Sequence, residues 1–317
     1  MDEANILVIS DLHLGEDLKP ASAGFLRHVA ILERELEAFL RHYTRVRRDG
    51  RPWELVINGD MVDFLSVCLI PTKQEYTDEA SGDPEELVYG LGARPHQARA
   101  KILRVLERHP GVFRALAGFV AAGNRVRIVL GNHDVEFHWP VVQDAFKQGV
   151  AKLGAGDAVE LGITFHPWFY FRENLVWIEH GHQYDEYCSF DYILNPVEPD
   201  QEEIALSLGG AGYRYISNHV AGADPHQQED WNMLGYLRFS LGLGLRGVWR
   251  MATGYAGMAR RMVRSWRAFT RRPADVEHRR RGHRERLRQL ASKWRLSEET
   301  LTALNELRGR PVVTNLA

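Results

Sequence analysis

The chain has 317 residues, of which 44% are hydrophobic and 26% are charged, a composition typical of a soluble globular protein with one large or two smaller domains. Two cysteines cannot build a disulfide framework, so we expect a reducing, cytoplasmic location. The first apolar strand begins by Asn5, so we expect no signal peptide. Arginines interrupt the most apolar stretch, residues 233–258, so we expect no membrane span.

The formal net charge of −2 conceals a strong asymmetry. Residues 246–288 contain 14 arginines, no lysine and three acids, or about +11, which leaves about −13 on the rest of the chain. Aromatic residues and methionines lie between these arginines, as in an amphipathic helix at a membrane interface. Three interpretations are open: a solvated helical face, a surface peripheral to the anionic inner face of a membrane, and, less favoured, a nucleic-acid surface.

The order of predicted elements begins as a β-α-β unit. A strand over 6–9 precedes a long amphipathic helix from about 25 to 46, which Gly50-Arg51-Pro52 ends before a second strand over 55–58. This order predicts parallel strands with a right-handed crossover. Further helices are predicted over 61–69, 85–107, 111–122 and 140–153, and further strands over 126–130, 159–166, 168–172 and 175–179.

The character of the chain changes at about residue 196, where the strand patterns end. A charged helix is predicted over 275–294, and Ser297 is a suitable N-cap for a short last helix. We therefore divide the chain into an α/β core, residues 1–195, and an arginine-rich helical appendage, residues 196–317.

Polar side chains with metal-ligand chemistry follow three of the apolar strands. The first strand runs into Asp11-Leu12-His13, the second into Gly59-Asp60-Met61-Val62-Asp63, and the third into Gly131-Asn132-His133-Asp134. The carboxyl ends of parallel strands are where open α/β sheets bind ligands. A later strand runs into His180-Gly181-His182. Oxygen and imidazole ligands without cysteine suit Mn²⁺, Fe or Zn²⁺.

These residues predict a site for two divalent ions. Asp11 and His13 can reach one ion, and Asp60 can bridge to a second one, which Asn132 and His180 can reach. Two ions about 3.5–4 Å apart would activate a bridging water and clamp a phosphoryl group. His133 could donate a proton to the leaving oxygen, and Asp134 could hold that imidazole in its charged form. His182 is a further candidate for metal or substrate contact.

The four motifs together resemble those of the calcineurin-like metallophosphoesterase superfamily over about residues 5–185. The resemblance implies a four-layered α-β-β-α fold. It also implies that Asp11, His13 and Asp60 bind the first metal, that Asp60, Asn132 and His180 bind the second, that His133 and Asp134 assist catalysis, and that Asp63 is structural. The His-Gly motif followed by a helical insertion is most similar to UDP-2,3-diacylglucosamine diphosphatases, which cleave a pyrophosphate in a lipid precursor.

The family's fifth motif, Gly-His-x-His on a later strand, is not found in this sequence. Two explanations are open. Either His180-x-His182 serves as the fifth motif with His166 in place of the fourth, or the chain stops before the fifth motif, which we favour. In the second case each ion lacks a ligand, so we expect weaker metal binding and slower turnover.

We therefore predict a metallophosphoesterase with two divalent ions, Mn²⁺ being favoured over Fe and Zn²⁺. Its substrate is a phosphomonoester, a phosphodiester or a pyrophosphate, either a small molecule or lipid-linked and near a membrane. A Mn²⁺-dependent nuclease is the alternative enzyme. A weakly active or non-catalytic module that binds anions or a membrane is the alternative from another class.

Overall fold

A four-stranded parallel sheet forms the centre of the protein, and the predicted parallel β-α-β arrangement is confirmed. The computed structural model describes residues 4–19, 23–71, 77–198, 202–220 and 242–308. The strand order is β1-β2-β3-β4, and neighbouring strands pair in parallel throughout. The strands are β1 (Asn5–Ile9), β2 (Trp53–Asn58), β3 (Arg125–Val129) and β4 (Ile163–His166).

Helices cover one face of this sheet. Alternate residues of β2, such as Leu55 and Ile57, are fully buried against them in the main hydrophobic core. Three of these helices begin with a proline, which fits the first turn because its missing N–H has no partner there in any helix. The layer contains α1 (Ala23–Arg45), α3 (Pro95–Arg108), α4 (Pro110–Ala121), α5 (Pro140–Val150) and α6 (Ala158–Gly162).

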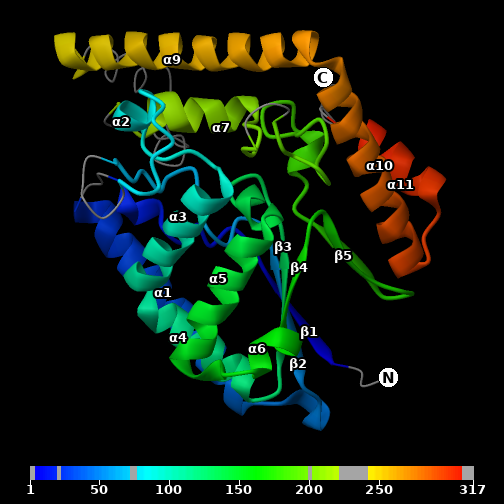
Figure 1. Cartoon of the computed structure of the whole chain (residues 1–317). Coiled ribbons are helices and arrows are strands. Elements are labelled where there is room, and N and C mark those ends of the chain that lie inside the picture. Colours follow the sequence, from blue (N-terminus) through cyan, green and yellow to red (C-terminus); the bar gives the residue numbers. More distant parts are fainter. Residues whose placement is uncertain (1–3, 20–22, 72–76, 199–201, 221–241, 309–317) are drawn as a thin grey trace, which may run out of the picture.

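A β-hairpin and two helices cover the other face. The hairpin consists of β5 (Phe169–Arg172) and β6 (Val176–Glu179), and its Tyr170 and Ile178 pack against Val56 and Val129 of the sheet. On its outer side, α10 (Pro273–Trp294) and α11 (Glu298–Glu306) close a second hydrophobic cluster. Helices, sheet, hairpin and helices follow one another in Figure 1, so the expected four-layered α-β-β-α core with a C-terminal helical region is confirmed.

A separate group of helices lies at one end of the molecule. The long helix α9 (Gly244–Arg271) runs across this end and contacts α7 (Leu208–Gly212) and the π-helical turn η7 (Tyr213–Ser217) through the smaller cluster around Tyr215 (Figure 1). None of the described helices combines the length and the apolar character that a membrane span needs. The division of the chain at residue 195 stays a prediction.

The remaining elements are short. They are η1 (Glu16–Leu18), η2 (Arg48–Gly50), α2 (Glu86–Tyr89), η4 (Val135–His138), η5 (Ala151–Ala155) and η6 (His182–Tyr184). At α11, the Ser297 side chain accepts a hydrogen bond from the Thr300 amide, so the predicted N-cap is confirmed.

Three predicted elements were wrong in whole or in part. Residues 61–69 form no helix, because the Asp63 carboxylate accepts hydrogen bonds from the Ser66 amide and hydroxyl and turns the chain instead. The helix predicted over 85–107 is two helices, separated at Gly90, whose φ of 78° ends α2. The strand predicted over 159–166 is only β4, because its first residues complete α6.

Candidate metal centre

The loops after β1 and β2 lie side by side at the carboxyl end of the sheet. The Asp11 amide donates to the Gly59 carbonyl and the His13 amide donates to the Asp60 carbonyl, at 3.2 and 2.9 Å. Asp11, His13 and Asp60 all have left-handed backbones, with φ of 55°, 43° and 53°. Such conformations are costly outside glycine and cluster at functional sites. The loops therefore hold these three side chains in set positions at the expense of backbone strain.

The Asp60 carboxylate lies at the centre of the predicted ligands. Its Oδ2 is 3.8 Å from His13 Nε2 and 3.2 Å from His180 Nε2, while its Oδ1 accepts a hydrogen bond of 2.9 Å from the His133 amide. Asp11 Oδ1 lies 3.9 Å from His13 Nε2 on the more exposed side. One buried carboxylate thus faces ligands from several loops.

His180 is oriented so that one ring nitrogen faces this carboxylate. Its Nδ1 donates to the Asn58 carbonyl at 3.0 Å, which leaves Nε2 without a proton in the neutral ring. That Nε2 lies 3.2 Å from Asn132 Oδ1 as well as 3.2 Å from Asp60 Oδ2. A backbone hydrogen bond of this kind is a common way to orient a metal-binding histidine.

Two motif glycines are needed because side chains approach them closely. A Cβ on Gly59 would collide with the His180 ring, and a Cβ on Gly131 would collide with the Asp60 carboxylate. Any other residue at either position would displace one of the predicted ligands. The glycines therefore belong to the site although they supply no ligand.

The carboxylate that holds His133 is Asp63. His133 Nδ1 donates to Asp63 Oδ1 at 2.9 Å, and His13 Nδ1 lies 3.7 Å from Asp63 Oδ2. The predicted partner, Asp134, instead accepts hydrogen bonds from the Gly131 and Met61 amides, at 2.6 and 2.8 Å. Because both of its oxygens are occupied by the backbone, we reassign Asp134 from orienting His133 to fixing the loop that carries it.

The electrostatics of the site favour bound positive charge. Burial opposes ionisation of Asp60, but contacts with His180, His133 and His13 outweigh it and lower the pKa of Asp60 to about 2. Burial likewise lowers the pKa of His13 and His180, but Asp63 and Asp60 outweigh it and raise both pKa values to about 9. Carboxylates that attract protons onto two imidazoles offer the same attraction to divalent cations.

The two remaining histidines of interest occupy different surroundings. His182 is buried with its ring centroid 5.5 Å from that of His180, and neither of its nitrogens has a hydrogen-bond partner among the described residues. His166 lies at the end of β4, where its Nε2 is 3.1 Å from the Thr164 hydroxyl and its ring stacks on Trp294. These contacts place His166 in the sheet packing, whereas His180 is the histidine beside Asp60 and Asn132.

One neighbour of the site had no signal in the sequence. The Tyr213 ring meets the His133 ring edge-on, with centroids 4.8 Å apart, and the Lys19 ammonium lies 5.8 Å from the centre of the Tyr213 ring. Tyr213 comes from η7, about 30 residues after the last motif in the sequence, His180-Gly181-His182. The sequence did contain a signal for the carboxylate that holds His133, namely Asp63 three residues after Asp60. That role was nevertheless assigned to Asp134 from the sequence.

The residues present fit a divalent metal site. Carboxylate groups of Asp11 and Asp60 and the His13 imidazole offer ligand atoms within 4.8 Å of one another, and His13, Asp63 and His133 form a second such group. Asn132 and His180 add an amide oxygen and an imidazole beside Asp60. Hard oxygen and borderline nitrogen donors without thiolate suit divalent ions such as Mn²⁺, Fe²⁺ and Zn²⁺. Together, the sandwich fold and this ligand set at its strand ends define a metal-dependent phosphoesterase.

Comparison with protein families agrees with this class. The family of calcineurin-like phosphoesterases matches residues 4–232, which is more than half of the chain. The chain therefore belongs to this family, whose members are hydrolases that use divalent metals and act on phosphoester bonds. Comparisons with curated proteins and with solved structures gave no match.

Proposed function

We propose that the protein hydrolyses a phosphomonoester, a phosphodiester or a pyrophosphate through a dinuclear site. Asp11, His13 and Asp60 would hold one ion, and Asp60, Asn132 and His180 the other. The observation that carries this proposal is the convergence of both sets on the buried Asp60 carboxylate, which lies within 4 Å of His13 and His180. A lipid-linked pyrophosphate, by analogy with UDP-2,3-diacylglucosamine diphosphatases, is one member of this substrate range.

The residues around the ligands have separate roles in this proposal. Bound divalent ions supply Lewis acidity and make a nucleophile available near neutral pH. The His133 Nδ1–H donates to Asp63, which leaves Nε2 as the atom that carries a proton to the leaving oxygen. Asp63 supports this transfer, because a buried carboxylate on Nδ1 favours the protonated ring. Tyr213 restricts the ring from its side.

Metal removal and reconstitution test the dinuclear proposal directly. We expect about two ions per chain by mass spectrometry after equilibration with Mn²⁺, and loss of bis(4-nitrophenyl) phosphate hydrolysis after chelation. Adding back Mn²⁺ should restore turnover, and Fe²⁺ and Zn²⁺ serve as comparison ions. A single equivalent of metal with full turnover would rule out the dinuclear site, and turnover unaffected by chelation would rule out metal dependence in this preparation.

The Asp63→Asn variant tests the assignment of Asp63 to His133. We expect kcat to fall about 10²-fold or more, because the imidazole loses the carboxylate that favours its protonated form. The loss should be larger for phenyl than for 4-nitrophenyl phosphoesters, because phenolate is the poorer leaving group and needs the proton more. A purely structural role would lower the rates of both substrates equally.

Two further variants serve as controls for this assignment. Because the pair acts as a unit, Asp63→Asn combined with His133→Asn should be about as slow as His133→Asn alone. Asp134→Asn, which alters a carboxylate bonded to backbone amides, should show no dependence on the leaving group. Additive losses in the double variant would contradict the proposed pairing.

A further inference from the structure

The outer face of α9 is apolar, and none of the described residues covers it. Successive side chains of an α-helix are rotated by about 100°, so residues spaced three or four apart share a face. In α9 this face extends along a helix about 42 Å long. Leu245 is 92% exposed, Trp249 70% and Trp266 65%. The same face contains further exposed apolar residues: Val248, Tyr255, Met262, Val263 and Phe269. A contiguous apolar surface of this kind marks an interaction site. We call these eight residues the α9 outer face.

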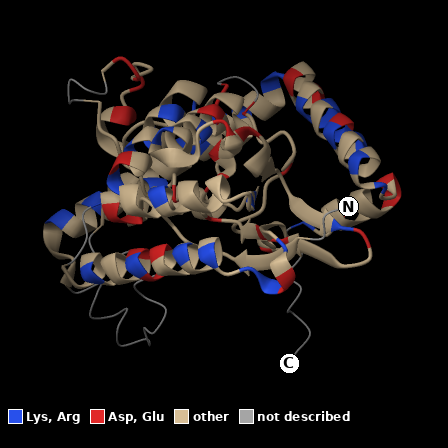
Figure 2. Ribbon diagram, turned by 90° about the horizontal axis from the view of Figure 1, so that it is seen from below, with Lys and Arg blue, Asp and Glu red and all other residues tan. Residues whose placement is uncertain are grey.

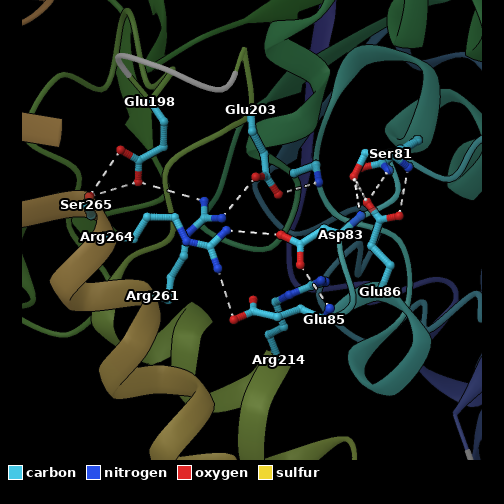
Figure 3. A network of polar contacts seen from close by, with 12 residues as sticks. Ser81, Asp83, Glu85, Glu86, Glu198, Glu203, Arg214, Arg261, Arg264 and Ser265 are labelled. Atoms are coloured by element: carbon cyan, nitrogen blue, oxygen red, sulfur yellow. Dashed lines mark hydrogen bonds and ion pairs between the residues drawn. The ribbon is translucent and has the colours of Figure 1, made fainter. Parts of the chain in front are cut away.

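The opposite side of α9 is attached firmly to the protein. Gly254 and Gly257 allow the helix to approach closely, because a Cβ at Gly254 would collide with the Tyr215 carbonyl and one at Gly257 with the rings of Tyr215 and Tyr89. Figure 3 shows Arg261 and Arg264 reaching from this helix to carboxylates of neighbouring segments. Arg261 pairs with Glu203 at 2.9 Å, and Arg264 pairs with Asp83 and Glu85 at 3.0 Å each.

These inner contacts determine which side of the helix is left outside. The buried residues of α9 are Gly254, Gly257, Arg261 and Ala268. They lie on the side toward η7, the 83–93 segment and the carboxylates of Glu198 and Glu203. In Figure 1 no described element lies beyond α9 on its other side. The outer face is therefore held outward by the buried Arg261–Glu203 pair and by the half-buried contacts of Arg264.

The charges of α9 are all of one sign. The helix contains seven arginines and no acid, whereas acidic and basic residues are mixed on several other helices in the view of Figure 2. Arg246, Arg260, Arg267 and Arg271 fall along one edge of the outer face, and within the described ranges none of the four forms an ion pair. An apolar face edged by unpaired arginines is complementary to a surface with apolar depth and anionic headgroups.

Charge also argues against the other occupants of this face. A second copy of the chain would place the same arginines against one another in a symmetric interface, which is repulsive. A nucleic acid would need the arginines, rather than tryptophan, leucine and valine, at the centre of the contact. An anionic bilayer satisfies both features, since the apolar side chains enter the acyl boundary while the arginines stay at the phosphates.

We propose that the protein docks on anionic lipid bilayers through the α9 outer face. This goes beyond the proposed hydrolysis, because docking needs neither metal nor turnover. It also relates the membrane to the metal centre: η7 packs against α9 and, through Tyr213, against His133. The π-helical turn η7 therefore lies between the docked helix and the candidate metal centre.

Vesicle flotation with the full chain tests this proposal. We expect the protein to bind vesicles of equimolar phosphatidylcholine and phosphatidylglycerol at least about tenfold more tightly than vesicles of phosphatidylcholine alone. The Trp249→Ser, Trp266→Ser double variant should lose at least about tenfold in binding, because both side chains are exposed in water and buried in the bilayer. The Arg260→Gln, Arg267→Gln double variant should lose the preference for phosphatidylglycerol, as should the wild type at about 1 M salt.

The matched control removes apolar side chains that are equally exposed elsewhere. Leu161 on α6 and Leu175 in the β5–β6 turn are 87% and 63% exposed, so the Leu161→Ser, Leu175→Ser variant should bind like the wild type. Four results would overturn the proposal: no preference for anionic vesicles, unchanged binding of the tryptophan variant, equal loss in the leucine control, or vesicle binding replaced by a dimer or a single-stranded DNA complex that the tryptophan variant cannot form. All readouts are independent of hydrolysis, so failure of docking and failure of the proposed activity are distinguishable.

Discussion

Replacing Asp60 with asparagine should lower phosphoester hydrolysis by about 10³-fold or more and reduce the metal content of the protein. The reason is that Asp60 alone faces both ligand sets: its Oδ2 lies 3.8 Å from His13 and 3.2 Å from His180. Asparagine keeps the shape and the Oδ1 that accepts from the His133 amide, but it removes the negative charge. Metal-supplied charge stabilisation is worth several kcal/mol, and each 1.36 kcal/mol is about tenfold in rate.

A matched charge removal distinguishes this effect from a change in net charge. Asp157 is an exposed carboxylate at the start of α6, so Asp157→Asn removes one charge far from the ligands and should leave turnover and metal content unchanged. Thermal unfolding of both variants checks that Asp60→Asn stays folded. A folded Asp60→Asn protein that retains two ions and a tenth of the wild-type rate would contradict the bridging role of Asp60.

The strand ends of this protein were predictable because each motif follows an apolar strand directly. Once Leu55, Val126 and their neighbours are assigned to parallel strands, Asp60 and Asn132 must emerge at the same edge of the sheet. The long helix α1 was equally clear, since its apolar positions recur with helical spacing over 23 residues. A hydrophobic pattern that repeats over a whole strand or a long helix predicts the element more reliably than a few local residues do.

Contacts made across the chain were harder to predict. The sequence 61–69 has helical character, but the Asp63 carboxylate contacts Ser66, His133 and His13. These contacts fix a non-helical backbone in this segment. Asp134 follows His133 directly and was predicted to be its partner, yet adjacent residues in a turn point in different directions. The approach of Tyr213 depends on how α7 and η7 dock, which no local pattern encodes. Side-chain orientation in irregular segments is set by tertiary contacts.

The attachment of α9 is another such contact, and it predicts the second large effect. Arg261→Met should lower the free energy of unfolding by about 3–5 kcal/mol, the usual cost of breaking a buried ion pair from one side. Arg261 is 7% exposed, and Glu203 and Glu198, its partners at 2.9 and 3.8 Å, are each 8% exposed. Both carboxylates would remain buried without the guanidinium that holds the pKa of Glu203 below its usual value against the effect of burial.

The loss of stability should arise mainly from the buried carboxylate left without a partner, rather than from the missing arginine side chain itself. Adding Glu203→Gln to Arg261→Met should therefore recover part of the loss, because a neutral amide is cheaper to bury than an unpaired carboxylate. Arg260→Met, at the exposed neighbouring position, should change the stability by less than about 0.5 kcal/mol. Denaturant unfolding measures all three variants, and the melting temperature of Arg261→Met should fall by roughly 5–8 °C. If Arg261→Met and Arg260→Met are equally stable, the buried pair does not hold α9 in place, and the outward orientation of its apolar face would need another cause.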